Sequence, residues 1–142
     1  SRLISKIMFG AYNKHIKNVR TVNDWLTRDE AVVDEYNAGK LTTFLFTVNG
    51  YRGLMNMILY VRKPRNIERI PKNLPMLMIS GLDDPVGEYG KGVYRAYNSY
   101  HGHIDDIDLR LYEDCRHELC NELNKEEIYE EIYGWIMNHM SK

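Results

Sequence analysis

The spacing of apolar residues predicts that the first half of the chain is helical. Apolar side chains recur at helical spacing over residues 3–8, which predicts a helix that runs to about Phe9 and ends at Gly10. Residues 27–30 read Thr-Arg-Asp-Glu, the capping-box form in which the Thr accepts a backbone N–H and the Glu reaches back. This motif predicts a second short helix, with the Thr as its N-cap and Gly39 as its end.

The stretch that follows fits two patterns. Apolar residues fall on one helical face at Phe44, Val48, Tyr51, Met55 and Ile58. Every second residue from 42 to 48 could instead share one face of a strand, and the pair Asn49-Gly50 could form a turn. We predict a helix, and we expect its Met, Leu and Phe side chains to pack in the core rather than line a lipid-facing surface.

The second half predicts a strand, a helix, a second strand and a final helix. Residues 76–79 form a short apolar run bounded by Pro and Gly, which is typical of a central strand buried on both faces. Apolar spacing over residues 93–100 predicts a helix, and residues 107–112 predict the second strand. Such a unit has parallel strands and a right-handed crossover. The final helix starts near Lys125, with an acidic outer face and a buried face formed by Ile128, Ile132, Trp135, Ile136 and Met140.

Composition and charge narrow the classes of function. The 142 residues suffice for one domain with its own core, and 19 Lys and Arg against 20 Asp and Glu leave a net charge of −1. Because the two signs are interspersed along the chain, nothing favours a nucleic-acid partner. The longest uncharged and mainly apolar stretch, residues 41–51, is too short for a membrane span. With no signal peptide and with two cysteines, Cys115 and Cys120, the protein is predicted to be soluble, reduced and cytoplasmic.

Two polar motifs directly follow the two predicted strands. Residues 81–87 read Gly-Leu-Asp-Asp-Pro-Val-Gly, and residues 114–119 read Asp-Cys-Arg-His-Glu-Leu. Since the carboxyl ends of parallel strands meet at one edge of the sheet, both motifs should lie at the edge where ligands bind. An Asp and then a His at successive strand ends match the last two members of the Ser, Asp, His order of a hydrolase triad. We assign Asp84 as the acid, His117 as the base and Asp83 as the rival acid; Asp84 is preferred because the proline that follows restricts its backbone.

Other interpretations of the same residues stay open. Asp84 could be a turn residue and His117 an incidental loop histidine, because Asp-Pro is common in turns. A metal site would use the cysteines together with His101, His103 and His117, yet neither C-x-x-C nor H-x-x-x-H spacing is present. A thiol nucleophile at Cys115 is disfavoured, because residues two apart do not face each other on a helix and point the same way only in a strand.

Beyond their spacing, the motifs resemble those of a known family. The forms G-x-x-D-P-V-G at residues 81–87 and Arg-His-Glu at residues 116–118 are similar to the acid and histidine motifs of bacterial lysophospholipases and monoacylglycerol lipases. These are serine hydrolases of the α/β-hydrolase superfamily, which also contains the serine aminopeptidase-like proteins. Residues 24–29, Asp-Trp-Leu-Thr-Arg-Asp, resemble a motif of the cap region in the same family, as do residues 46–51. The resemblance covers nearly the whole chain.

This resemblance implies the C-terminal portion of an α/β-hydrolase fold. Residues 1–71 would form the helical cap, and residues 72–142 would form the last part of the core, with two parallel strands and flanking helices. The sequence starts within an amphipathic pattern, as if entered in the middle. In the family the nucleophile lies on a G-x-S-x-G elbow that precedes the cap. That elbow surrounds none of the serines of this chain, which are Ser1, Ser5, Ser80, Ser99 and Ser141.

The implied function is hydrolysis of a carboxylic or lipid ester through an acyl-serine intermediate. Asp84 and His117 would supply the acid and the base of the triad, and no cofactor or metal is implied. Without a nucleophile the chain is expected to be inactive alone. Its expected partner is the N-terminal half of the fold or a second copy of the chain, and its substrate a small ester or lipid. The alternative is a non-catalytic fragment that acts as a binding or assembly module.

Overall fold

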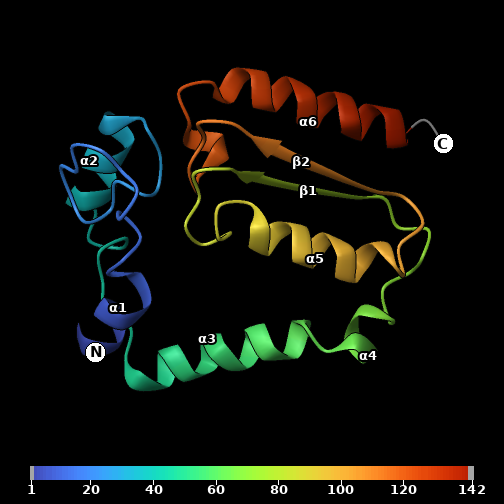
Figure 1. Ribbon diagram of the computed structural model, residues 1–142, viewed down its shortest axis with the longest axis horizontal. Helices are drawn as coiled ribbons and strands as arrows, with labels where there is room; N and C mark the ends of the chain where they lie inside the picture. The colour runs from blue at the N-terminus through green and yellow to red at the C-terminus, as the bar shows by residue number, and fades with distance from the viewer. Residues whose placement is uncertain (1, 141–142) are drawn as a thin grey trace.

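The structure, a computed structural model, describes residues 2–140 (Figure 1). Helices form its N-terminal half, and two strands with flanking helices form its C-terminal half. In chain order the elements are α1 (Arg2–Phe9), α2 (Glu30–Ala38), α3 (Val48–Val61), α4 (Pro64–Ile67), β1 (Met76–Gly81), α5 (Lys91–His101), β2 (Ile107–Tyr112), the 3-10 helix η1 (Leu119–Asn121) and α6 (Lys125–Met140).

Local capping determines where the first helices begin and end. Both α1 and α2 end immediately before a glycine, at Gly10 and Gly39, as predicted. The N-cap of α2 is Asp29 and not the predicted Thr27, because the Asp29 carboxylate accepts two N–H groups of the first helical turn. Thr27 Oγ1 does accept a backbone N–H, that of Asp29 at 3.1 Å, and it donates its own hydrogen to the Asn121 carbonyl at 2.8 Å. The capping-box pattern therefore located the helix but named the wrong cap.

The third helix confirms the helical interpretation of its segment. Thr47 caps α3 by accepting the Gly50 N–H, so the Asn49-Gly50 pair lies in the first turn of a helix rather than in a hairpin. The expected core packing is wrong for most of α3, because this helix runs along the periphery, away from the sheet (Figure 1). Tyr51 is its buried residue. The exposed apolar side chains of α3 include Val48, Met57, Leu59, Tyr60 and Val61.

The sheet consists of two parallel strands joined by a helical crossover, as predicted. Met76 of β1 pairs with Ile107 of β2 at the start of the register, and Gly81 pairs with Tyr112 at its end. Helix α5 connects the strands and packs against the sheet, and α6 lies on the opposite face (Figure 1). Both strands point toward the side of the molecule that holds α1 and α2 (Figure 1). The loops that follow the strands therefore face the N-terminal half.

A small core lies between the sheet and α6. Ile128 of α6 is fully buried together with Cys115, and Leu119 of η1 is nearly so. Ile79 of β1 and Tyr112 of β2 pack against this group from the sheet. The apolar periodicity of the last helix therefore predicts its central contact with the strands correctly.

Two predicted apolar faces are less buried than their patterns indicated. Residues 76–79 are half-buried rather than buried on both faces, because β1 has β2 as its one strand neighbour within residues 2–140. Near the end of α6, Ile136 and Met140 are 42% and 74% exposed, because two strands cover only part of the helix face. Both departures come from the small width of the sheet.

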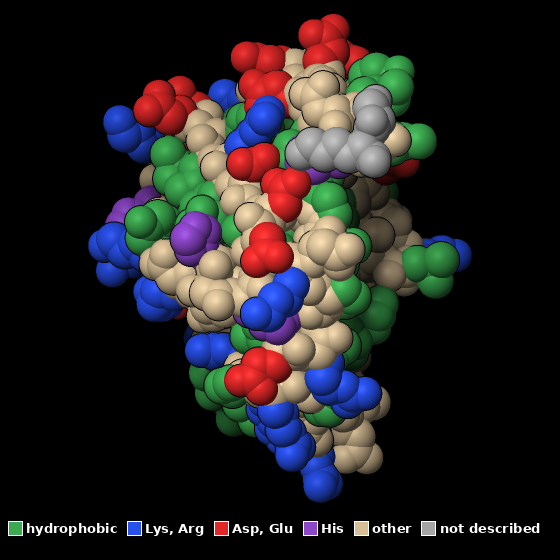
Figure 2. All heavy atoms as spheres, turned by 90° about the vertical axis from the view of Figure 1, so that its right-hand side faces the viewer, with side chains coloured by type: hydrophobic (Ala, Val, Ile, Leu, Met, Phe, Trp, Pro, Cys, Tyr) green, Lys and Arg blue, Asp and Glu red, His purple; other side chains and the backbone are tan. Residues whose placement is uncertain are grey.

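Charges that are mixed along the sequence separate in the fold. Acidic side chains gather at the end of the molecule formed by α6, and Lys and Arg side chains gather at the opposite end, near α3 and α4 (Figure 2). The predicted acidic outer face of α6 is confirmed for Glu126, Glu127 and Glu130, which are exposed. It is wrong for Glu131, which is half-buried because it binds Arg110 and Tyr112 of β2. Each helix in the described part of the chain is too short or too polar to cross a bilayer.

Candidate active site

The two strand-end loops meet at Gly81, the last residue of β1. A Cβ atom on Gly81 would lie 2.0 Å from the carbonyl oxygen of Cys115 and 2.3 Å from that of Arg116, so a glycine is required for the loop after β2 to come this close. Asp83 then donates its N–H to the Cys115 carbonyl, at 2.9 Å. The two motifs predicted for one sheet edge are thus joined directly through their backbones.

Asp84 and His117 face each other across this junction. His117 Nδ1 lies 3.0 Å from Asp84 Oδ2, and the other carboxylate oxygen, Oδ1, accepts the Val86 N–H at 2.8 Å. A carboxylate only accepts, so Nδ1 carries the hydrogen and Nε2 keeps a free lone pair. Asp84 is buried, whereas the His117 side chain is 37% exposed. The predicted proximity is confirmed, and Asp83, the rival acid, is exposed.

The Asp84 hydrogen bond makes His117 easier to protonate. It is the largest cause that raises the pKa of His117 above 6.5; burial lowers this pKa, and the charges of Asp84 and Glu118 raise it further. Because the folded state holds this proton more tightly than the unfolded chain, the pair stabilises the fold fully below about pH 6.5 and loses its effect as pH rises through the folded pKa.

We therefore predict that Asp84→Asn lowers the pKa of His117. NMR titration of the imidazole measures this pKa in both proteins. Urea unfolding should show the larger stability deficit of the variant in acid, and a smaller deficit as pH rises past the wild-type pKa. Equal His117 titration curves in the two proteins would contradict the pairing.

An aromatic cluster from the N-terminal half packs against His117 through Trp25. The Trp25 ring lies 5.1 Å from the His117 ring between centroids, and Tyr12 packs edge-on against Trp25 at 5.0 Å. Phe9 stacks on Trp25 at 6.5 Å. Burial raises the pKa of the Tyr12 phenol, and the charge of Asp84 raises it further. The motif at residues 24–29 could have pointed to Trp25, but no local pattern marks Tyr12 or Phe9 as neighbours of the site.

The positions of the cysteines do not fit a thiol nucleophile. Cys115 is fully buried and donates its S–H to Asn124 Oδ1, at 3.4 Å. Burial raises the pKa of its thiol, which keeps the sulfur protonated and unreactive. Cys120 is exposed, and both cysteines are free.

Potential metal ligands gather away from His117. Within residues 2–140, the group whose ligand atoms lie within 4.8 Å of one another is Asp106, Asp108 and His139, at the start of β2. His139 Nε2 lies 3.3 Å from Asp106, and Trp135 donates its indole N–H to Asp108 at 2.7 Å. Asp106 and Asp108 are thus each bound by a side chain of α6, and the histidines named from the sequence as possible ligands are not in this group.

The serine next to the acid motif is not placed as a nucleophile. Ser80 is buried near the end of β1, and its hydroxyl donates to the Gly81 carbonyl at 3.3 Å. His117 Nε2 therefore has no hydroxyl partner in Ser80.

Comparison with known proteins is consistent with this arrangement. Residues 1–124 match the sequence model of the family described as serine aminopeptidase, S33. A highly thermostable carboxyl esterase from Bacillus coagulans, solved in complex with glycerol, is 23% identical with a TM-score of 0.83, over 99% of this chain and 45% of that one. A lipase in its open form is 22% identical with a TM-score of 0.78, over 92% of this chain and 42% of that one. No curated protein sequence matches.

The chain spans less than half the length of either solved structure. At these identities the structural likeness shows the fold, which is that part of an α/β-hydrolase with two parallel strands and flanking helices. The family match covers most of the sequence and includes both Asp84 and His117. The chain therefore belongs to the serine aminopeptidase S33 family of α/β-hydrolases.

Proposed function

We propose that this chain supplies the acid and the base of a Ser-His-Asp triad that hydrolyses carboxylic esters. The observation that supports it is the hydrogen bond between His117 Nδ1 and Asp84 Oδ2, 3.0 Å long, at the carboxyl edge of a parallel sheet. In the proposed reaction, His117 Nε2 takes the proton of the serine hydroxyl and later passes it to the leaving group. Asp84 holds the ring in the required tautomer and stabilises the imidazolium that forms.

The proposed partner is the N-terminal half of the hydrolase fold, in the same polypeptide or as a second one. A groove of about 410 Å³ lies open between β1 and α5, and Asp84 is among its walls. Its apolar lining includes Met78, Val86, Val93 and Ala96. An open strand edge beside an apolar groove favours the addition of another strand. The half that supplies this strand would also bring the serine and the oxyanion hole to His117.

The proposed substrate is a lipid ester of the lysophospholipase or monoacylglycerol type. Residues 1–71 would act as the cap, because Trp25 already packs against His117 and Tyr12 packs on Trp25. Exposed apolar residues of the same segment could contact an acyl chain: Leu41, Phe44, Leu45, Met55, Met57 and Leu59. The esterase and the lipase with similar folds favour an ester over a peptide. Free thiols fit the reducing cytoplasm as the proposed compartment.

Hydrolysis of p-nitrophenyl esters tests the proposal. The isolated 142-residue chain should act no faster than free imidazole, because loss of the triad serine costs about 10⁶ in rate. The natural protein that contains these residues should show saturable turnover. Fast turnover by the isolated chain, abolished by Cys115→Ala, would instead identify a thiol enzyme. Absence of turnover in the natural protein would leave a binding or assembly module, for which the open β1 edge is the docking surface.

A further inference from the structure

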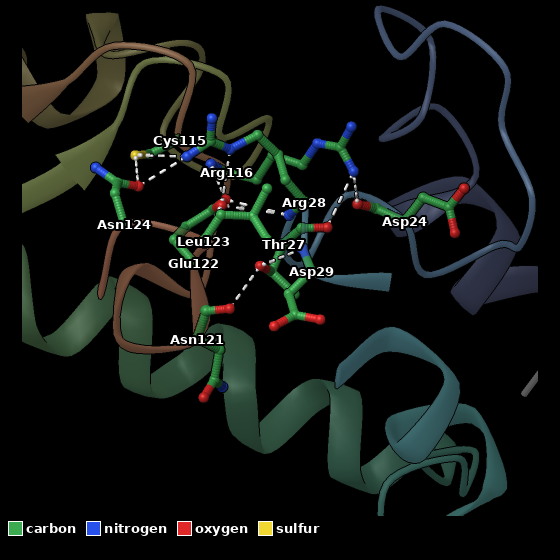
Figure 3. A network of polar contacts seen from close by, with 10 residues as sticks. All are labelled: Asp24, Thr27, Arg28, Asp29, Cys115, Arg116, Asn121, Glu122, Leu123 and Asn124. Carbon is green, nitrogen blue, oxygen red and sulfur yellow. Dashed lines mark hydrogen bonds and ion pairs between the residues drawn. The ribbon is translucent and has the colours of Figure 1, made fainter. Parts of the chain in front are cut away.

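One carboxylate deep in the fold gathers hydrogen bonds from both halves of the chain. Glu122 is fully buried, and its Oε2 accepts from Arg28 Nε at 2.8 Å (Figure 3). Its Oε1 accepts the backbone N–H of Arg116 at 2.7 Å and that of Arg28 at 3.3 Å. Glu122 thus binds Arg28, which belongs to the N-terminal half, and Arg116, which directly precedes His117.

The Arg28 guanidinium is held by more than one acceptor. Its Nη2 donates to Asn124 Oδ1 at 2.7 Å and contacts Cys115 Sγ at 3.7 Å (Figure 3). Since Asn124 and Cys115 flank the loop that carries His117, Arg28 binds both ends of this loop. A guanidinium suits this position because it offers several donors in one fixed plane.

Further hydrogen bonds join residues 116–118 to backbone carbonyls of segment 24–28. The Arg116 side chain donates from Nη1 to the carbonyl oxygens of Asp24 and Thr27, at 2.7 and 3.0 Å (Figure 3). His117 donates its N–H to the Trp25 carbonyl at 3.4 Å, and the next residue along the loop donates to Leu26 at 2.7 Å. Segment 24–28 and the His117 loop are therefore bound residue by residue.

We propose that Glu122 and Arg28 are positioning residues for His117: their buried ion pair clamps segment 24–28 onto the His117 loop and so holds the imidazole against Asp84. The clamp requires both halves of the chain. The His117 ring is therefore oriented only when segment 24–28 is packed against the His117 loop. The catalytic consequence rests on the proposed hydrolase function, whereas the orientation of the ring does not.

The substitution that tests the clamp is Glu122→Gln in the natural protein. An amide has one acceptor oxygen and an NH2 donor, so it must turn a donor toward either Arg28 or the Arg116 N–H. The loop should then shift, and the His117–Asp84 hydrogen bond should loosen. Glu131→Gln is the matched control, because the Glu131 carboxylate of α6 binds Arg110 and Tyr112 of β2, outside the His117 loop.

The titration of His117 gives a readout that a purely structural role would not change. The charges that raise the pKa of His117 are Asp84 and Glu118, and Glu122 is not among them. Tyr12 and Trp25, which lie over the pair, are uncharged near neutral pH. A lower His117 pKa in folded Glu122→Gln therefore reports a moved ring rather than a lost charge. The control should keep the wild-type curve.

The expected kinetic effect is on kcat rather than on KM. A displaced general base should lower kcat about 10- to 100-fold, and the acid limb of the pH profile should move to lower pH with the His117 pKa. Asn124→Ala, which keeps the Glu122 carboxylate, should produce smaller changes in the same direction and decides the matter if Glu122→Gln does not fold.

A folded variant at either position with the wild-type His117 titration and the wild-type kcat would overturn the clamp. The two proposals can fail separately. An inactive natural protein would refute the hydrolase proposal, yet the NMR titration would still test whether Glu122 orients His117.

Discussion

Replacing Asp84 with Asn in the natural protein is expected to lower kcat for ester hydrolysis about 10⁴-fold without unfolding it. The Val86 N–H donates to Oδ1 of Asp84, at 2.8 Å. In the variant this N–H keeps the amide oxygen in that place, so the amide NH2 points at His117 Nδ1. The imidazole must then accept at Nδ1 and carry its hydrogen on Nε2, where it cannot take a proton from the serine.

Steady-state kinetics with a p-nitrophenyl ester measure this effect, and circular dichroism checks the fold. Asp83→Asn is the matched control, because Asp83 is the adjacent carboxylate and its side chain is exposed. It should keep turnover near the wild-type value. If Asp83→Asn lost activity and Asp84→Asn kept it, the acid would be the rival residue and the assignment made here would be wrong.

Gly81→Ala is expected to lower the free energy of unfolding by about 3 kcal/mol, near the upper end for overpacked sites. The new Cβ would lie 2.0 Å from the Cys115 carbonyl oxygen and 2.3 Å from the Arg116 carbonyl oxygen. Both atoms belong to the backbone, so no side-chain rotation relieves the overlap. Moving the loop away would break the Asp83 N–H bond to the Cys115 carbonyl and separate His117 from Asp84.

Urea unfolding measures this loss, and Gly134→Ala provides the control. A Cβ on Gly134, inside α6, meets no atom within 4 Å. Alanine there should therefore stabilise the protein by about 0.5–1 kcal/mol, because it has the higher helix propensity. A Gly81→Ala protein with the wild-type unfolding midpoint and His117 titration would show that the loops do not cross as closely as described.

Periodicity along the sequence predicted the elements because it reflects the backbone itself. The apolar run at residues 76–79 and the apolar residues of 107–112 marked both strands, and glycines marked the ends of α1 and α2. Since parallel strands end at one edge, the motifs that follow them brought Asp84 and His117 together in prediction and in structure. Each of these inferences uses residues that are near in sequence or that a topological rule brings together.

Contacts between distant segments were beyond this reasoning. The Arg28–Glu122 ion pair joins residues 94 positions apart, and neither residue stands in a pattern that names its partner. The same holds for Tyr12 and Phe9, which pack on Trp25 beside His117. Thr27 is likewise not the N-cap of α2, a position held by Asp29; its hydroxyl binds the Asn121 carbonyl, which only the folded chain brings near.

Sequence by itself thus determined the two strands, the longer helices and the pairing of Asp84 with His117, because backbone periods and parallel topology are local or general properties. It did not predict the short helices α4 and η1. Tertiary structure alone decided which apolar faces are covered, as at exposed Ile136 and half-buried residues 76–79. It also decided how His117 is held, because a buried carboxylate such as Glu122 must find its donors wherever the fold places them.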